Sequence, residues 1–404
     1  MNSAPGRRGR RRAARALGAG LVAALLASCG LVDGDRSGSS TPTDPNAYRM
    51  EPACGPAPAE FPVSAEIVNR VVSSNSTLPA WEAGDIGASA RLSDNRLVWV
   101  FGDTVRGDDY IPKIVANSML LSSGLCLSQV MTRFDQPIIP DVSEKVVHWP
   151  MSVARLDPAK IKDPAVPPGT SDILVVFTGR IERGTQNALD FRYLGFSATI
   201  FTVRRGEAPQ RVLTLEITPD RTNQDQIHWG AAAMVDQGWY YVYGSRLPKG
   251  SFGRELYVGR APVARPAVRS GWQFWDGKRW QSDLEKARPV LPASEGVSQT
   301  LSVSRTHGQY VVVSKKDGDL GDFVYTWSSR SPTGPWRGRK GVKAPYGVNQ
   351  DELQYAPLGH PEIPLESGKL LVSISRNTTD LTKLLREPEQ VGRPVFTEIE
   401  IPPL

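Results

Sequence analysis

The feature that most constrains the fold of this chain is a run of apolar residues that recurs five times. Each run is almost continuously apolar and ends on a small residue followed by a polar one. The five runs are RLVWVFGDT (96–104), DILVVFTGR (172–180), WYYVYGSR (239–246), QYVVVSKK (309–316) and KLLVSISRN (369–377). Their last large apolar residues are Phe101, Phe177, Tyr243, Val313 and Ile374, spaced by 76, 66, 70 and 61 residues. Repetition at a nearly fixed period indicates an architecture built from repeated units.

This repeat predicts an all-β fold, a five-bladed β-propeller. Five units share about 345 residues, or about 69 residues each, which suits blades of four strands. The runs are apolar at successive positions, as expected for strands buried on both faces. A sandwich of two sheets is the alternative all-β fold, but it explains the five-fold spacing poorly.

The segment before each apolar run is rich in small residues, which suits the innermost strand of a blade. These segments are GDIGASARL (84–92), HWPMSVARL (148–156), HWGAAAMVD (228–236), VSQTLSVSR (297–305) and YAPLGHPEI (355–363). We further expect the final VFTEIEIPPL (395–404) to share its blade with an N-terminal strand near SAEIVNRVV (64–72). Such a pairing would close the ring and remove exposed strand edges.

The N-terminus reads as an export signal. Six arginines precede a short apolar run, which ends at Leu26-Ala27-Ser28-Cys29. The run is too short to span a membrane, and its end resembles the bacterial lipobox. The resemblance implies that Cys29 becomes the lipid-modified first residue of the mature protein; an ordinary secreted protein with a chance cysteine is the alternative. We therefore expect a lipoprotein signal peptide at 1–28, a lipidated cysteine and flexible linker at 29–59, and the propeller at 60–404.

Removing the signal changes the charge of the chain. The whole chain has 48 Lys+Arg and 42 Asp+Glu, and the six arginines before Cys29 account for the entire excess. The mature protein is neutral, so its charge gives no reason to expect a nucleic-acid partner.

The three cysteines agree with export. With Cys29 assigned to lipid, Cys54 and Cys126 remain as the pair available for one disulfide. The sequence contains neither a Cys-x-x-Cys pair nor a zinc-ligand spacing, and we expect no metal and no cofactor.

Two aspartates in the first repeat are the candidate catalytic residues. In a propeller blade, the start of the innermost strand and the end of the second strand lie on the same face, roughly 5 Å apart. Asp85, in GDIG, and Asp103, in FGDT, occupy these two places. Glycoside hydrolysis needs such a pair, one acid to protonate the leaving oxygen and one to activate water or attack the sugar. Each aspartate, taken alone, is equally compatible with capping a turn.

Only the first repeat ends its apolar run on an acid. The aligned positions of the other four carry Gly179, Ser245, Lys315 and Arg376. This asymmetry favours chemistry at Asp103 over a general feature of the fold.

Histidines and aromatic residues near the inner strands are candidates for substrate binding. Flat apolar rings stack on the C–H faces of sugars, and neighbouring histidines add hydrogen bonds. The candidates are Trp81, His148, Trp149, His228, Trp229, His360 and Glu362. The alternative for each His-Trp pair is a hydrogen-bonded core histidine beside a packing tryptophan. Three histidines around one axis could also hold a metal, although no carboxylate–histidine spacing singles this out.

Several reaction types have no motif here. There is no Gly-x-Ser-x-Gly nucleophile elbow, no phosphate-binding glycine loop and no dinucleotide fingerprint.

The order GDIG, WVFGDT, HWG and then YAPLGHPEI…GKLLVSISRN resembles the domain of unknown function 4185, whose members are placed in glycoside hydrolase family 183. The resemblance covers roughly residues 60–404.

The resemblance implies a five-bladed propeller that hydrolyses the D-arabinan of mycobacterial arabinogalactan and lipoarabinomannan. It further implies an inverting aspartate pair, which falls on Asp85 and Asp103. By analogy with other five-bladed glycosidases, Asp85 would be the general base and Asp103 the general acid. Many of those enzymes instead place a glutamate acid in the third blade, where this chain has HWGAAAM; on that pattern His228 or Glu362 would have to substitute.

The leading hypothesis is thus a lipid-anchored endo-D-arabinanase of the cell envelope, a monomer held to the outer face of the membrane by its N-terminal lipid. The competing hypothesis is a non-catalytic propeller lipoprotein that binds envelope glycan or scaffolds a protein. It predicts aspartates that lie too far apart or are engaged in a salt bridge.

Overall fold

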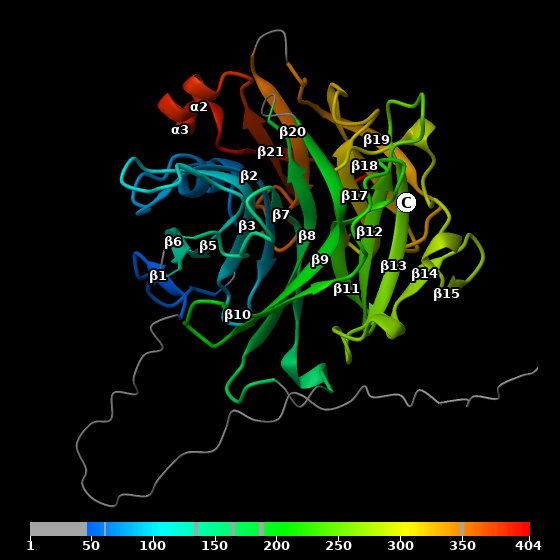
Figure 1. Cartoon of the computed structure of the whole chain (residues 1–404), viewed down its shortest axis with the longest axis horizontal. Coiled ribbons are helices and arrows are strands. Elements are labelled where there is room, and N and C mark those ends of the chain that lie inside the picture. Colours follow the sequence, from blue (N-terminus) through cyan, green and yellow to red (C-terminus); the bar gives the residue numbers. More distant parts are fainter. Residues whose placement is uncertain (1–46, 60–61, 133–135, 163–165, 186–189, 348–350) are drawn as a thin grey trace, which may run out of the picture. The chain divides into compact units, whose positions relative to one another are not determined.

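The computed structural model describes residues 47–404 except 60–61, 133–135, 163–165, 186–189 and 348–350. Five antiparallel sheets follow one another along the chain and form a five-bladed β-propeller (Figure 1), which confirms the predicted fold. The signal peptide and Cys29 lie outside the described residues. None of the helices in the described part is long and apolar enough to cross a membrane.

The sheets are named here as blades one to five. Blade one holds β2 (Trp81–Arg91), β3 (Leu97–Arg106), β5 (Ser118–Ser123) and β6 (Cys126–Met131), with β1 (Arg49–Glu51) beside β6 and β4 (Ile114–Val115) beside β3. Blade two holds β7 (Val146–Leu156), β8 (Asp172–Arg183), β9 (Phe191–Val203) and β10 (Gln210–Glu216). Blade three holds β11 (His228–Asp236), β12 (Trp239–Arg246), β13 (Glu255–Pro262), β14 (Gln273–Trp275) and β15 (Trp280–Gln281). Blade four holds β16 (Ser302–Thr306), β17 (Gln309–Lys315), β18 (Phe323–Ser329) and β19 (Arg337–Lys343). Blade five holds β20 (Leu353–Gly359), β21 (Leu370–Asn377) and β22 (Val395–Ile399).

The helices are short. They are α1 (Ala65–Val68), the π-helix η1 (Asn69–Ser73), α2 (Leu381–Arg386), α3 (Pro388–Val391) and the 3-10 turns η2 (Pro158–Lys160), η3 (Arg269–Gly271), η4 (Leu284–Lys286) and η5 (Ala293–Glu295).

The first strand of each blade is the innermost. Strands β2, β7, β11, β16 and β20 contact one another in turn around the ring, and β20 contacts β2 again. The five apolar runs form the second strands, and all seven residues of β17 are buried. Apolar clusters fill the space between blades; for example, Phe177 of blade two packs 6.1 Å from Tyr240 of blade three. We call the end of the propeller at which the inner strands begin and the second strands end the mouth face.

The predicted strand at 64–72 is wrong, because this segment is helical. Ser64 caps α1 by accepting a hydrogen bond from the Ile67 backbone N–H, and its apolar residues recur at helical rather than strand spacing. Among the strands that the structure describes, β22 pairs with β21 alone. In place of a strand, the side-chain amide of Asn69 accepts from the Phe396 N–H and donates to the Phe396 carbonyl, both at 2.8 Å. Asn69 thus hydrogen-bonds backbone groups on the edge of β22, where we expected a closing strand to pair.

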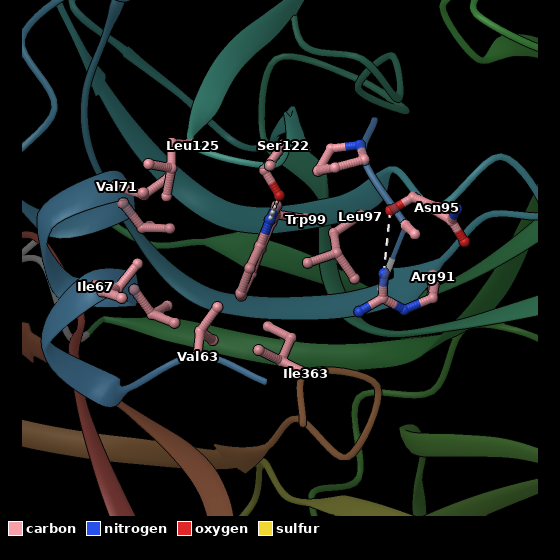
Figure 2. A pocket seen from close by; sticks show the side chains of 15 residues that line it. Val63, Ile67, Val71, Arg91, Asn95, Leu97, Trp99, Ser122, Leu125 and Ile363 are labelled. Atoms are coloured by element: carbon pink, nitrogen blue, oxygen red, sulfur yellow. Dashed lines mark hydrogen bonds between the residues drawn. The ribbon is translucent and has the colours of Figure 1, made fainter. Parts of the chain in front are cut away.

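The helical segment covers an apolar cavity on the outside of blade one. The cavity measures about 620 Å³, its open mouth included, and its lining includes Ile67 and Val71 on the helical side and Leu97 and Trp99 on β3. Figure 2 shows Trp99 standing in its centre, with the indole N–H donating to the Ser122 hydroxyl at 3.2 Å.

The folded unit begins earlier in the sequence than residue 60. Strand β1 pairs with β6 in register from Arg49 to Glu51, and Cys54 forms a disulfide with Cys126. Part of the segment predicted as a flexible linker therefore belongs to blade one. The disulfide holds it there because Cys126 opens β6.

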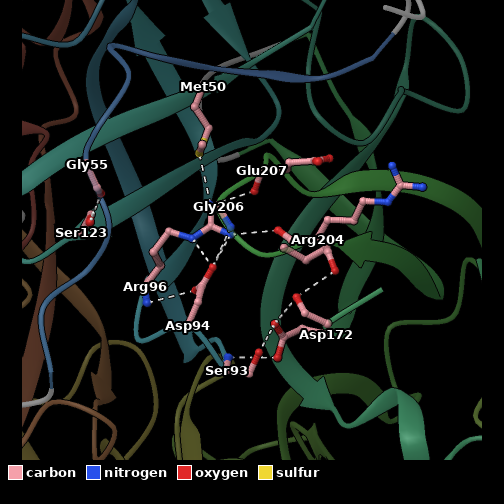
Figure 3. Close-up of polar contacts among 12 residues, drawn as sticks. Met50, Gly55, Ser93, Asp94, Arg96, Ser123, Asp172, Arg204, Gly206 and Glu207 are labelled. Atoms are coloured by element: carbon pink, nitrogen blue, oxygen red, sulfur yellow. Dashed lines mark hydrogen bonds and ion pairs between the residues drawn. The ribbon is translucent and has the colours of Figure 1, made fainter. Parts of the chain in front are cut away.

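A buried polar cluster fixes blade one against blade two. Figure 3 shows Arg96 ion-paired with Asp94, which also accepts from the backbone N–H of Gly206 at 2.9 Å. Nearby, Asp172 accepts from both the backbone and the hydroxyl of Ser93. Since buried polar groups are costly unless paired, these contacts favour one relative position of the two blades.

We predict that the double variant Cys54→Ser/Cys126→Ser folds but loses stability. The disulfide joins residues separated by 72 positions, and a loop of that size corresponds to about 4 kcal/mol of chain entropy in the unfolded state. Unfolding by guanidinium chloride checks this. Equal midpoints for the two proteins, both purified under oxidising conditions, would contradict it.

Candidate active site

Asp85 and Asp103 lie on adjacent strands at the mouth face. Gly84 pairs with Thr104 and Ile86 pairs with Phe101, so the bulge between these pairs sets Asp85 against the Gly102-Asp103 step. The bulge includes Ile86 at φ 70°, an unusual conformation for a β-branched residue. Its backbone N–H is held by the Ser375 hydroxyl at 3.0 Å. The strained backbone thus places the Asp85 side chain beside the end of β3.

The Asp85 carboxylate occupies the space over Gly102 that a side chain there would need. A Cβ at position 102 would collide with the carboxylate oxygen Oδ1 of Asp85. The absence of a side chain at Gly102 therefore lets the Asp85 carboxyl lie against the end of β3, next to Asp103. This explains why the apolar run ends on glycine before aspartate.

Asp103 is held through one of its two oxygens. Oδ1 accepts from the Trp149 indole N–H at 2.8 Å and forms an ion pair with Arg183. Among the described residues, no group hydrogen-bonds to Oδ2, and 36% of the side chain is exposed. Burial raises the pKa of Asp103 to about 7; Arg183 opposes this shift, and the nearby Asp85 adds to it.

Asp85 is held from the opposite side by blade five. Its Oδ2 accepts from the Tyr355 hydroxyl at 2.8 Å, and Asn377 donates to that hydroxyl oxygen at 3.2 Å. Burial raises the pKa of Asp85 to about 6, against the lowering effects of the Tyr355 hydrogen bond and of Arg183. Both carboxyls therefore exchange protons near neutral pH.

Four residues of this site were not predicted from the sequence. Arg183, Tyr355 and Asn377 contact the pair or its partners, and Asp141 raises the pKa of Asp103 through its charge. Tyr355 opens the predicted inner strand of blade five, a placement that could have identified it. Arg183 lies beyond the apolar run of β8, and nothing in the local sequence marks it.

Of the two His-Trp pairs, only one contributes a residue to this site. Trp149 contacts Asp103, whereas the buried His148 bonds the Pro140 carbonyl at 2.9 Å through Nδ1. In blade three both members are buried. Trp229 lies in the apolar core, and His228 stacks on Tyr193 at 4.1 Å between ring centroids.

The buried ring of His228 contacts Arg254 as well as Tyr193. Its Nδ1 faces the Arg254 guanidinium at 2.8 Å, and burial holds its pKa well below the usual value. Nε2 is buried with no hydrogen-bond partner among the described residues. Burial therefore favours the neutral imidazole at His228.

His360 and Glu362 lie away from the mouth face. Tyr355 at the start of β20 reaches Asp85, while His360 follows the end of β20 and bonds Ser89, four residues further along β2, at 2.5 Å. Glu362 also contacts the Ser89 hydroxyl. The sequence suggested both residues as substrate-binding candidates near the inner strands, and the structure places them beyond β20, which ends at Gly359.

Trp81 is likewise part of the core. It is buried, and its ring packs 5.1 Å from Phe101.

The apolar cavity of Figure 2 is not lined by either acid, so it lies apart from the candidate site. The three inner-strand histidines have separate partners, and no three His, Cys, Asp or Glu residues in the described part of the chain group together to hold a metal.

The fold and the site define a five-bladed β-propeller with two neighbouring carboxyl groups of raised pKa at its mouth face. Residues 75–400 match the family described as domain of unknown function DUF5005. The chain therefore belongs to that family. The narrower resemblance to domain of unknown function 4185 stays a prediction.

Solved structures share the fold. A protein from Bacteroides ovatus, provisionally named a hydrolase, aligns with a TM-score of 0.61 at 15% identity, covering 87% of this chain and 93% of its own. Weaker similarities include an arabinoxylan arabinofuranohydrolase from Bacillus subtilis (TM-score 0.47, 9% identity, 79% and 65% coverage) and an α-L-arabinofuranosidase from Podospora anserina (TM-score 0.44, 10% identity, 88% and 98% coverage). No curated protein matches the sequence.

We predict that Gly102→Ala destabilises the protein through Asp85. The added methyl group displaces a packed carboxyl, at a cost of about 1–3 kcal/mol. In an Asp85→Ala background the same substitution should cost much less. Denaturant unfolding of the four proteins measures this coupling, with Gly55→Ala as the control because a Cβ there meets no atom within 4 Å. Equal costs in both backgrounds would show that Asp85 does not require the glycine.

Proposed function

We propose that this protein is a glycoside hydrolase that cleaves D-arabinofuranosyl linkages, with Asp103 as general acid and Asp85 as general base. The observation that carries the proposal is the pair itself: two carboxyls on adjacent strands, partly open to solvent, with pKa values raised to about 7 and about 6. Hydrolysis with inversion requires one protonated and one ionised carboxyl on opposite sides of the scissile bond, with room for a water beside the ionised one.

The contacts of Asp103 suit a proton donor. Trp149 and Arg183 both engage Oδ1, so the proton resides on Oδ2 and is available to the glycosidic oxygen. As the bond from that oxygen to the anomeric carbon breaks, Asp103 becomes a carboxylate. The adjacent Arg183 guanidinium stabilises the charge that forms.

The contacts of Asp85 suit a base that activates water. Tyr355 fixes Oδ2, which leaves Oδ1 to accept a proton from the attacking water. The water oxygen bonds to the anomeric carbon on the face opposite the leaving group, and inversion follows. The hydrolysis consumes one water, whose proton passes to Asp85.

The substrate class rests on the sequence resemblance. The motifs GDIG and WVFGDT, with their order in the chain, favour D-arabinan of arabinogalactan or lipoarabinomannan and internal cleavage. We also propose that the protein is exported and anchored by a lipid on Cys29. The Cys54–Cys126 disulfide supports export, because such bonds persist in oxidising compartments.

One observation favours a second candidate, a propeller that binds envelope glycan without cutting it. Asp103 is engaged in an ion pair with Arg183, as a non-catalytic site would allow. The two candidates differ in one product, because only the hydrolase generates new reducing ends.

The test is incubation of the purified protein with mycobacterial arabinogalactan, followed by chromatography of the products. The proposal predicts released oligoarabinosides whose first-formed anomers are inverted by proton NMR. Asp85→Asn and Asp103→Asn should each lower the rate at least about a hundredfold while the proteins unfold at normal denaturant concentrations. Glycan binding without release, or undiminished turnover in both variants, would contradict it.

We predict a narrow bell-shaped dependence of kcat/KM on pH, with an optimum between about 6 and 7. Below the pKa of Asp85 the base becomes protonated, and above the pKa of Asp103 the acid loses its proton. Initial rates between pH 4 and 9 check this. An activity plateau extending to pH 9 would exclude Asp103 as the acid.

A further inference from the structure

The hairpin of β8 and β9 carries an aromatic ring to the acid. These are the longest strands of the propeller, 12 and 13 residues, and their outermost pair joins Arg183 to Phe191. Both strands run through the centre of the view in Figure 1. Arg183 is the residue that pairs with Asp103. The geometry of the hairpin thus places Phe191 next to the ion pair of the proposed acid.

Phe191 is an apolar residue that is partly exposed to solvent, although exposure of an apolar ring to water is unfavourable. Its side chain is 37% exposed, and its ring packs edge-on against Trp149 with 4.8 Å between centroids. Trp149 in turn donates to Asp103. The two rings therefore form a continuous apolar surface that ends at the carboxyl, and we name Phe191 and Trp149 the aromatic pair.

We propose that the aromatic pair is a subsite for the sugar on the leaving-group side of the scissile bond, with the ring of Phe191 stacking on the C–H face of that sugar. The inference rests on the proposed hydrolase function. In this proposal, blade two binds the part of the glycan that leaves after Asp103 has protonated the glycosidic oxygen.

The two acids are supported from different blades, which separates the two sides of the bond. Asp85 is held by Tyr355 and Asn377 of blade five, whereas Asp103 is held by blade two. A general acid must touch the glycosidic oxygen, which leaves with the departing sugar. Groups that surround Asp103 and not Asp85 therefore contact that sugar.

The competing explanation is that Phe191 only positions Trp149, and through it Asp103. The two explanations predict different kinetics. A subsite contributes to KM, because stacking stabilises bound substrate as well as the transition state. A positioning residue changes kcat and the pH profile, because it alters the environment of the acid.

The test compares Phe191→Ala with the parent and with Phe191→Tyr on oligosaccharides of D-arabinan. We expect Phe191→Ala to raise KM about tenfold, equivalent to about 1.4 kcal/mol, with kcat within about twofold and the pH profile unchanged. Phe191→Tyr keeps a flat ring and should restore KM. Val212→Ala is the control, because Val212 is 47% exposed on β10 of the same blade. An unchanged KM, or a lower kcat with a shifted pH profile, would overturn the subsite.

A binding measurement separates this inference from the proposed function. In Asp85→Asn the amide oxygen can still accept the hydrogen bond from Tyr355. This variant and the double variant Asp85→Asn/Phe191→Ala are each titrated calorimetrically with the same oligosaccharides. Weaker binding in the double variant supports the subsite. Equal affinities, or no binding to Asp85→Asn itself, would overturn it. Failure of the parent to release reducing ends would contradict the hydrolase instead.

Discussion

The second strand of each blade is buried on both faces, and the positions of the functional groups depend on this constraint. A strand packed between two apolar layers cannot slide by one residue without exchanging side chains of different shape between two close-packed faces. In blade one, the buried run up to Phe101 therefore fixes how far Asp103 reaches beyond the core. The same packing holds Arg183 at the end of β8.

The acid pair is a local departure from this regular packing. Gly102 removes a side chain, the bulge at Ile86 bends β2, and the two carboxyls then share a partly desolvated space. Desolvation works against ionisation of both, and the charge of Asp85 further raises the pKa of Asp103. Arg183 and Tyr355 offset this from opposite sides. The structure thus maintains a proton near neutral pH at the cost of strain in the first blade, as is common at functional sites.

The fold and the acid pair were predictable because both depend on local pattern and simple topology. Continuous apolar runs identify doubly buried strands, and blade geometry then brings Asp85 to Asp103. The partners were not predictable, since Tyr355 lies 270 residues from Asp85 in the sequence. The segment 64–72 was misread because its apolar residues fit a helix once Ser64 caps it. His360 and Glu362 lie beyond the inner strand predicted at 355–363, because β20 ends at Gly359.

We expect Asp85 and Asp103 to titrate near neutral pH as a coupled pair. Carbon-13 NMR of the labelled aspartate carboxyls, assigned by the two Asn variants, measures this directly. The midpoints should lie near 6 for Asp85 and near 7 for Asp103, and the Asp103 midpoint should fall in Asp85→Asn because a neighbouring charge is removed. Midpoints for both groups at the ordinary aspartate value of about 4 would contradict it.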